Sequence, residues 1–297
     1  MRLAAIEAGG TKFVVAIGDE FGNIIKRDAF ATTSPQETFE HVFEFFDGEE
    51  FEAMGIGTFG PIDLDLLSPT YGYITSTPKP NWGNVDFVGP LKERYQVPIA
   101  FDTDVNGAAL GELYFGSAKG LDSCLYLTIG TGIGGGAIVE GKLVHGLLHP
   151  EMGHILLAKH KDETTDGFCP FHKNCLEGLA SGPAIEKRWG VKAYDLPVDH
   201  PAWEMEGYYL AEALMNFILT LSPQKIILGG GVMKQTQIFS YIHQYVVEML
   251  NGYVQKEEIL HHIKDYIVYP KLGDNAGICG ALALAMQARK NGLNESN

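Results

Sequence analysis

One local pattern occurs twice in the chain, and it limits the possible folds more than any other feature. In residues 3–30, an apolar strand, LAAIEA, leads into a glycine turn at 9–12 and continues as a second strand, FVVAIG, and a third extended segment. Residues 123–144 repeat this order, with a glycine loop at 131–135 between SCLYLTIG and the strand–turn–strand segment GAIVEGKLV. We interpret the pair as a weak internal duplication with one glycine loop in each of two lobes.

Strands alternate with helices along the rest of the chain, which is typical of an α/β fold. Helices are expected at 36–46, 86–95, 104–115, 202–221, 235–250 and 276–289, and further strands at 53–58, 97–102, 225–228 and 266–270. We therefore expect two lobes with a cleft between them. Residues 1–115 would form the N-terminal lobe, completed by a C-terminal helix over 276–297, and residues 116–275 the C-terminal lobe.

Composition limits the partners and the location. The 297 residues include 22 Lys and Arg against 37 Asp and Glu, a formal net charge of −15, and 45% are hydrophobic. The apolar share is enough for a full core, and the negative charge argues against nucleic acid or an anionic membrane as partner, because both are polyanions. The first residues contain no secretory apolar segment, and no stretch reaches the ~20 apolar residues of a membrane helix, so we expect a cytoplasmic protein.

The glycine loops have chemistry suited to phosphate. Tight turns without β-carbons let backbone N–H groups point at an anion, and the loops add threonine hydroxyls and the Lys12 ammonium group. Neither loop is a Walker A motif, because the pattern GxxxxGK[ST] is absent, and neither is a Rossmann motif, because strands follow them instead of helices. Ordinary hairpin turns would explain one loop, but two loops at matching places favour phosphate binding. A third glycine run, 229–231, follows a buried strand, where a ligand ring can approach the backbone.

Asp102 and Asp104 lie where a strand ends and a helix begins. Helix capping accounts well for one acid at such a place. The other is a candidate general base, which would orient a substrate hydroxyl and accept its proton. Phosphoryl transfer needs mainly positioning and charge neutralisation, so one base together with Mg²⁺ is sufficient.

Cys169, His172 and Cys175 form a C-x₂-H-x₂-C motif, and His154 lies upstream. Two thiolates and two imidazoles make a tetrahedral zinc set, and four protein ligands leave no open position, so we expect a structural zinc ion. The alternative without a metal ion is a loop of reduced cysteines with histidines nearby by chance. The other candidates for the fourth ligand are His145, His149 and His160.

Together these motifs resemble the ROK family of sugar kinases, in the actin/hexokinase-like superfamily. The matching segments cover nearly the whole chain: EAGGTK at 7–12, GTFGPID at 57–63, DVNGAA at 104–109, TIGTGIGG at 128–135, EMGH at 151–154, CLE at 175–177 and GGG at 229–231. The cysteine motif and the run GLASGPAIEKRWG after it are similar to the bacterial zinc-containing fructokinases of that family.

The resemblance implies a two-lobed actin-like/hexokinase-like (ribonuclease H-like) ATPase fold with an inter-lobe cleft. It also implies ATP-dependent phosphorylation of D-fructose to fructose 6-phosphate, with Asp104 as general base, Mg²⁺ bound with ATP, a structural Zn²⁺ and a homodimer. The implied ATP and phosphate contacts are Gly9, Gly10, Thr11, Lys12, Thr131, Gly132, Pro183, Gly230, Gly231, Val232, Met233, Lys234 and Gln235. The implied sugar contacts are Thr103, Glu151, His154 and Glu177, and the zinc ligands are His154, Cys169, His172 and Cys175.

Two departures bear on the chemistry. Many relatives have Asp at the position of Glu7, which affects the arrangement of Mg²⁺. Glucose-specific relatives have Asn where this chain has Thr103, and the lost amide fits a ketose better than glucose. The alternatives are a kinase for mannose, glucose or N-acetylmannosamine, and a non-catalytic sugar sensor on the same fold. The family's DNA-binding repressors carry an N-terminal helix-turn-helix. This sequence starts directly in the first strand and its negative charge disfavours DNA binding, so we do not expect a repressor.

Overall fold

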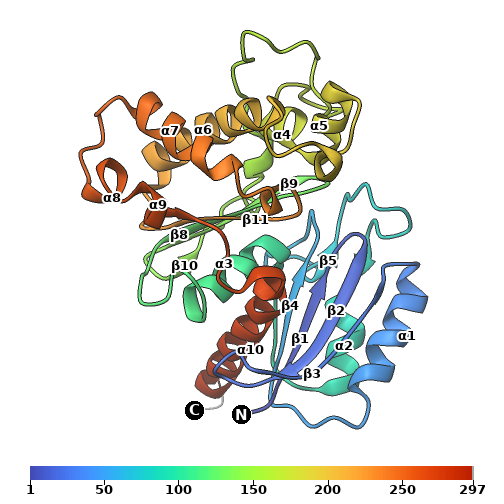
Figure 1. Ribbon diagram of the computed structural model, residues 1–297. Coiled ribbons are helices and arrows are strands. Elements are labelled where there is room, and N and C mark those ends of the chain that lie inside the picture. The colour runs from blue at the N-terminus through green and yellow to red at the C-terminus, as the bar shows by residue number, and fades with distance from the viewer. Residues whose placement is uncertain (296–297) are drawn as a thin grey trace. The chain divides into compact units, whose positions relative to one another are not determined.

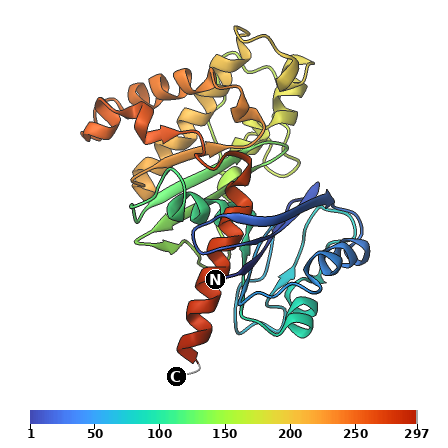
Figure 2. The same cartoon turned by 60° about the horizontal axis from the view of Figure 1, so that its bottom comes forward.

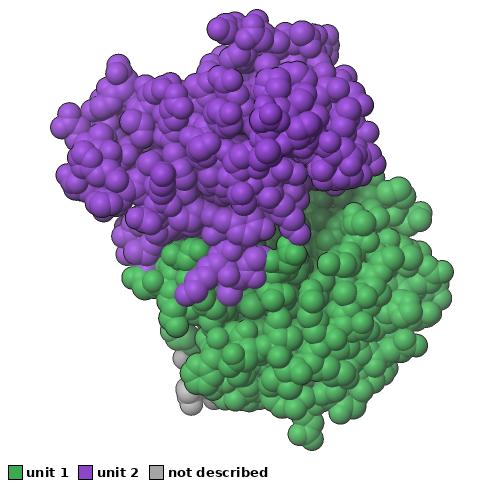
Figure 3. Space-filling view, in the orientation of Figure 1, with its two compact units in different colours: residues 1–120, 143–150, 274–297 green, residues 121–142, 151–273 purple. Residues whose placement is uncertain are grey.

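The computed structural model describes residues 1–295, which divide into two compact units (Figures 1 and 3). Unit 1 contains residues 1–120, 143–150 and the chain from 274 onward; unit 2 contains 121–142 and 151–273. The segment 143–150, which the sequence placed in the second lobe, therefore packs in unit 1. The helix expected over 276–297 is observed to residue 295, and its last two positions lie outside the described residues.

Unit 1 is built on a mixed five-stranded sheet in the order β3-β2-β1-β4-β7. Strand β1 (Leu3–Ala8) pairs antiparallel with β2 (Lys12–Gly18) and parallel with β4 (Met54–Thr58). On the outside, β3 (Ile24–Ala31) is antiparallel to β2, and β7 (Ile99–Thr103) is parallel to β4. A small hairpin of β5 (Tyr73–Ile74) and β6 (Val85–Asp86) lies in the connection between β4 and β7.

The two faces of this sheet are covered by different helices, because neighbouring residues of a strand point to opposite sides. Ile6 belongs to the core that contains α1 (Pro35–Phe46) and α2 (Val88–Tyr95), whereas Ala5 belongs to the core that contains α10 (Ala276–Glu295). Figures 1 and 2 show α10 along one face and α1 and α2 on the other.

Helix α10 also packs closely against α3 (Asp104–Tyr114). A β-carbon on Gly280 would lie 1.8 Å from the carbonyl oxygen of Gly107, and one on Gly55 would lie 1.9 Å from that of Ala281. Only glycine permits backbones to approach this closely. These contacts hold α3, and with it the residues at its N-terminus, against the sheet.

Unit 2 contains a second five-stranded sheet, in the order β10-β9-β8-β11-β12. Strand β8 (Cys124–Ile129) is antiparallel to β9 (Ile133–Val139) and parallel to β11 (Ile226–Gly229), just as β1 is to β2 and β4. The edge strands are β10 (Lys142–Leu143) and β12 (Ile267–Val268). The shared strand order accounts for the repeated pattern in the sequence.

The helices of unit 2 are α4 (Leu176–Ala180), α5 (Gly182–Trp189), α6 (Ala202–Leu221), α7 (Ile238–Leu250), α8 (Glu257–Leu260) and α9 (Ile263–Tyr266). Helix α7 begins three residues later than expected, because residues 235–237 form a bend and a turn after the 3₁₀ turn Val232–Lys234. Strand β9 begins earlier than expected, since Gly134 and Gly135 pair with β8 instead of belonging to the loop. None of the helices in residues 1–295 is long and apolar enough to cross a membrane.

Candidate active site and metal centre

The first glycine turn connects β1 to β2 in unit 1. The N–H of Gly9 donates to the carbonyl oxygen of Lys12 over 3.0 Å, and a β-carbon on Gly9 would lie 2.8 Å from that oxygen. Gly10, Thr11 and Lys12 are exposed at the tip of the turn. The turn therefore presents backbone N–H groups, a hydroxyl and an ammonium group to solvent, as the predicted phosphate contact requires.

Asp104, the predicted base, is the first residue of α3 and is half-buried. Thr103 caps this helix, because its Oγ1 accepts the N–H of Asn106 over 3.2 Å, and Thr103 is only 4% exposed. The hydroxyl predicted to touch sugar is thus already engaged with the backbone. Gly57 on β4 keeps space beside the acid, since a β-carbon there would lie 3.4 Å from the Cα of Asp104.

Glu7 near the end of β1 points toward the N-terminus of α10. A β-carbon on Gly277 would lie 2.4 Å from the Cδ of Glu7, so glycine makes room for this carboxyl group. Burial, and then the negative charge of Asp104, raise the pKa of Glu7 to about 7, against the opposing effect of Lys12. Its Oε2 is buried and has no hydrogen-bond partner among the described residues, which suits contact with a cation.

Asp102 has a different environment from Asp104, although only one residue separates them. Its Oδ1 accepts the N–H of Thr103 and the Nδ2 of Asn106, each over 2.7 Å. Its Oδ2 lies 2.9 Å from Nε2 of His145. Asp102 is therefore a buried structural acid, and Asp104 is the one of the pair that remains as candidate base.

The second glycine turn lies in unit 2, between β8 and β9. The N–H of Gly130 donates to the carbonyl oxygen of Gly132 over 2.9 Å, and Thr131 at the tip is exposed. Glu177 of α4 lies against this turn, since its Oε2 accepts the N–H of Ile133 over 3.0 Å. The N–H of Gly182, the first residue of α5, donates to the carbonyl oxygen of Gly130 over 2.8 Å. The turn is thus held between β8 and the beginnings of two helices.

The third glycine run approaches the same turn. Gly230 has a φ of +91°, and a β-carbon on it would lie 2.3 Å from the carbonyl oxygen of Ile129. Four predicted nucleotide contacts therefore come from segments that meet within unit 2: Thr131, Gly132, Pro183 and Gly230. Val232 and Met233 are 4% and 0% exposed, so their side chains belong to the core and only their backbone remains for a ligand. Gly231 and Lys234 are exposed, and Gln235 is half-buried.

His154, Cys169, His172 and Cys175 form a cluster whose four ligand atoms all lie within 4.8 Å of one another. Nδ1 of His154 is 3.6 Å from Sγ of Cys175 and 3.9 Å from Sγ of Cys169. Zinc bonds of ~2.3 Å to sulfur and ~2.0 Å to nitrogen, at tetrahedral angles, place such atoms about 3.6 Å apart. The donor set and spacing fit zinc.

The other candidates for the fourth ligand have different partners. His145 and His149 belong to unit 1, where His145 contacts Asp102 and Nε2 of His149 accepts the N–H of Ile62. His160 packs its ring on Tyr208. Of the remaining predicted sugar contacts, Glu151 is exposed and directly precedes the 3₁₀ turn Met152–His154 that carries the histidine ligand.

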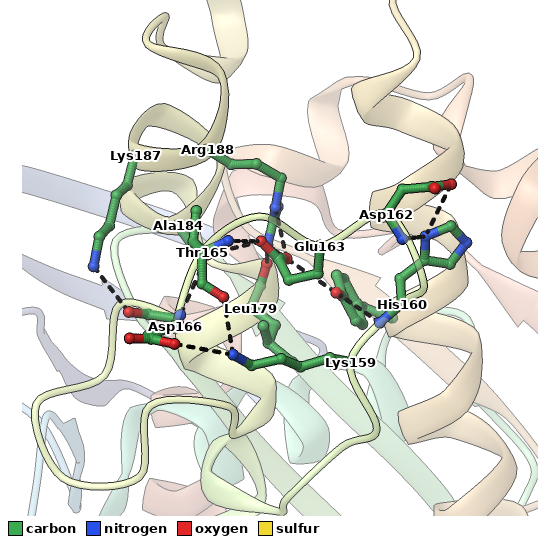
Figure 4. Close-up of polar contacts among 12 residues, drawn as sticks. Lys159, His160, Asp162, Glu163, Thr165, Asp166, Leu179, Ala184, Lys187 and Arg188 are labelled. Atoms are coloured by element: carbon green, nitrogen blue, oxygen red, sulfur yellow. Dashed lines mark hydrogen bonds and ion pairs between the residues drawn. The ribbon is translucent and has the colours of Figure 1, made fainter.

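The loop that carries the cysteines has a second anchor, which the sequence did not reveal (Figure 4). Glu163 lies 2.6 Å from Arg188 of α5, and their side chains are 0% and 4% exposed. Arg188 also donates to the carbonyl oxygen of Leu179, and Tyr209 of α6 donates its hydroxyl to Glu163. Burial opposes ionisation of Glu163, but the bond from Arg188 and those from Thr165 outweigh it and lower its pKa to about 2.

Two sheets with one strand order, each with a glycine turn after its first strand, define the two-lobed actin-like/hexokinase-like ATPase fold. The sequence profile of the ROK family matches residues 3–288, and the chain belongs to this family.

Individual relatives match along nearly their whole length. A protein of Bacillus subtilis (strain 168) is 58% identical over 96% of both chains. The fructokinase of Lactococcus lactis subsp. cremoris is 49% identical, over 91% of this chain and 92% of its own. Among solved structures, the ROK hexokinase from Thermus thermophilus superposes with a TM-score of 0.79 and 26% identity, over 98% of this chain and all of that one.

Proposed function

We propose that this protein is a fructokinase, which transfers the γ-phosphoryl group of ATP to D-fructose and releases fructose 6-phosphate and ADP. The observation that carries this proposal is the likeness to the Lactococcus fructokinase along nine-tenths of the chain. The geometry of unit 1 supports the chemistry, since it places one acid, Asp104, at the start of a helix that close backbone contacts hold against the sheet.

Asp104 is the general base of the proposed reaction. It accepts the proton of the C6 hydroxyl while that oxygen attacks the γ-phosphorus, and the bond from phosphorus to the β,γ-bridging oxygen breaks to release ADP. The N-terminal end of α3 favours the ionised form of an acid in its first turn. Asp104 must be in this ionised form to accept the hydroxyl proton.

The glycine turns of the two units are the proposed phosphate contacts. Exposed N–H groups and the Lys12 ammonium group would offset the charge of the transferring phosphoryl group. Mg²⁺ bound with ATP would supply further neutralisation, and Glu7, with its unpartnered Oε2, is the carboxylate of unit 1 suited to hold it or its water. Lys12 and Glu7 flank the same turn from its two strands.

The zinc ion proposed for the His154 cluster has a structural role. All four donors come from the protein, so no position remains for a substrate or a reactive water. The ion would tie the 3₁₀ turn after Glu151 to the start of α4, where Cys175 caps the helix and Glu177 follows. We also infer a homodimer from family membership, which sedimentation equilibrium would measure.

The direct test is to identify the product. Incubation with Mg-ATP and ¹³C-labelled fructose should convert the C6 signal to that of a phosphate ester, in step with ADP release. Asp104→Asn should fold normally, with an unchanged melting temperature, and should lose most of kcat. Near-wild-type kcat in that variant would remove Asp104 from its proposed role, and ADP release without a sugar phosphate would contradict the proposed reaction.

A further inference from the structure

A hydrogen-bonded pair beside the first turn of α3, which carries Asp104, joins buried Asp102 to His145, whose side chain is 39% exposed. The Asp102 side chain is 5% exposed, and its Oδ2 lies 2.9 Å from Nε2 of His145. Its other oxygen accepts from Thr103 and Asn106, so every contact of this carboxylate reaches the first turn of α3 or the histidine. No step of the proposed reaction uses either residue of the pair.

The direction of each hydrogen bond follows from the contacts. Asp102 accepts, so the Asn106 atom 2.7 Å away is its amide nitrogen, and the amide orientation is set. Nε2 of His145 is 3.3 Å from that same nitrogen, which cannot accept a hydrogen bond, and 2.9 Å from Oδ2 of Asp102, which can. Nε2 therefore carries a hydrogen and donates it to Asp102. This bond raises the pKa of His145, and partial burial opposes the rise.

The arrangement leaves one buried polar atom without a hydrogen-bond partner, which lowers the stability of the fold. Oδ1 of Asn106 is buried and has no hydrogen-bond partner among the described residues, and Asn106 is 1% exposed. Unpartnered buried amide oxygens are rare in folded proteins and are found where a site requires a particular geometry. Here the required geometry is that of the turn from Thr103 to Asn106.

His145 reaches this place because of two contacts made by its own segment. Residues 143–150 leave unit 2 after β10 and pack in unit 1. At one end of the segment His145 meets Asp102, and at the other Nε2 of His149 accepts the N–H of Ile62 over 3.2 Å. Pro150 is the last residue of the segment, and Glu151 of unit 2 follows it.

We propose that His145 is a positioning residue of the kinase reaction, which acts through Asp102 to hold the first turn of α3 and thereby Asp104. The effect on catalysis rests on the proposed function, whereas the contact between His145 and Asp102 does not depend on it. Without the histidine, Oδ2 of Asp102 would lose the hydrogen bond from Nε2, which stabilises the ionised carboxylate. A protonated Asp102 is a weaker acceptor for Thr103 and Asn106, so the turn would loosen.

Other titratable groups near the pair also affect the expected pH dependence of kcat/KM. Tyr71, in the connection before β5, faces Asp102, whose charge together with burial raises the pKa of the tyrosine. Asp104 lies two residues beyond Asp102 on α3. Glu7, whose pKa is raised to about 7 by burial and by the charge of Asp104, titrates in the same range. The part of the pH dependence that comes from His145 is therefore read from the difference between His145→Phe and the wild-type protein, which share Glu7.

The test compares His145→Phe with His145→Gln, whose amide nitrogen can still donate to Asp102. His145→Phe should lower kcat by about 10- to 100-fold, as expected for a displaced base, with a much smaller change in KM for ATP. The acid limb of its kcat/KM profile should move to higher pH, and His145→Gln should restore most of both. His41→Gln, at an exposed histidine 3.4 Å from Glu44 in the same unit, is the matched control and should change neither.

A second measurement detects the contact between His145 and Asp102 independently of enzyme activity. The chain has 10 histidines, and the imidazole signal that is missing in His145→Gln is assigned to His145. In ¹⁵N-edited NMR titrations, Asp102→Asn should lower the pKa of this imidazole. An unchanged pKa would refute the contact, and an unchanged kcat and pH profile in His145→Phe would refute the positioning role. If wild-type protein phosphorylates no hexose while the NMR coupling is present, the proposed function fails and the catalytic part of this inference fails with it.

Discussion

The guanidinium group of Arg188 lies 2.6 Å from Oε2 of Glu163, and neither side chain is more than 4% exposed. This pair joins the middle of the cysteine-bearing loop to α5, and α5 begins beside the second glycine turn. The loop is therefore anchored by an ion pair as well as by the proposed metal.

Arg188→Met should destabilise the protein, because it leaves Glu163 buried without its cation. A loss of about 3 kcal/mol in the free energy of unfolding is expected when one partner of a buried pair is removed. The double variant with Glu163→Met should recover much of this loss, since no buried charge remains. Urea unfolding of the three proteins measures the effect, and a double variant no more stable than Arg188→Met would contradict the coupling.

The same pair predicts sensitivity to acid. The folded-state pKa of Glu163, about 2, lies below its ordinary value of 4.5, so its contribution is fully present above pH 4.5 and is lost as the pH falls toward 2. Wild-type protein should therefore lose more stability between pH 5 and pH 3 than the double variant. Parallel acid dependences would show that the pair does not contribute there.

Glu206 on α6 should behave in the opposite way. It is 0% exposed, neither of its carboxyl oxygens has a hydrogen-bond partner among the described residues, and burial raises its pKa well above 4.5 despite the charge of Arg188. A raised carboxyl pKa means that stability is greatest below pH 4.5 and declines as the pH rises.

Glu206→Gln removes the ionisable group while keeping its shape, so it should stabilise the protein at pH 7 and make little difference at pH 4. Unfolding free energies at the two pH values measure this. Glu204→Gln, on the exposed side of the same helix, is the control and should show no such pH-dependent gain. Equal effects of Glu206→Gln at both pH values would contradict a neutral buried acid.

Zinc removal should affect the fold of the loop more than the chemistry. Mass spectrometry of metal content should find one zinc ion per chain, and Cys175→Ser should lose it while Cys124→Ala retains it. The melting temperature should fall on metal loss, because metal binding contributes directly to folding. An unchanged melting curve after verified loss of zinc would contradict the structural role, and so would a wild-type chain without metal.

Thr103→Asn tests the sugar preference at the residue before the base. Asn is as good a helix cap as Thr, so the variant should fold normally, whereas Thr103→Ala should lose about 1 kcal/mol of stability. An amide at this place should raise activity on glucose relative to fructose. Measured kcat/KM ratios that do not move would show that discrimination lies elsewhere.

The fold was predictable because its signals are local. Each glycine turn lies between two apolar strands, so the sequence pattern predicts the duplicated order of strands without knowledge of long-range contacts. The zinc set was predictable for a related reason, since three of its ligands lie within seven residues of each other. The ROK fold confirms the predicted two-lobed α/β architecture.

Contacts between distant residues could not be predicted in this way. His145 is 43 positions from Asp102, and Arg188 is 25 positions from Glu163, so neither pair forms a motif. The sequence suggests His145 only as a candidate metal ligand, because it lies close to the cysteine motif. The burial of Val232 and the engagement of the Thr103 hydroxyl also depend on packing that a linear pattern does not contain.

The central claim is most directly tested by coupled ADP release with Mg-ATP and, in turn, fructose, mannose, glucose and N-acetylmannosamine, compared as kcat/KM. A fructokinase should show a large preference for fructose, and Asp104→Asn should abolish this activity. A preference for another of these sugars would contradict the fructokinase assignment while leaving the fold, base and metal proposals in place. No turnover with any of the four would contradict the proposed function as a whole.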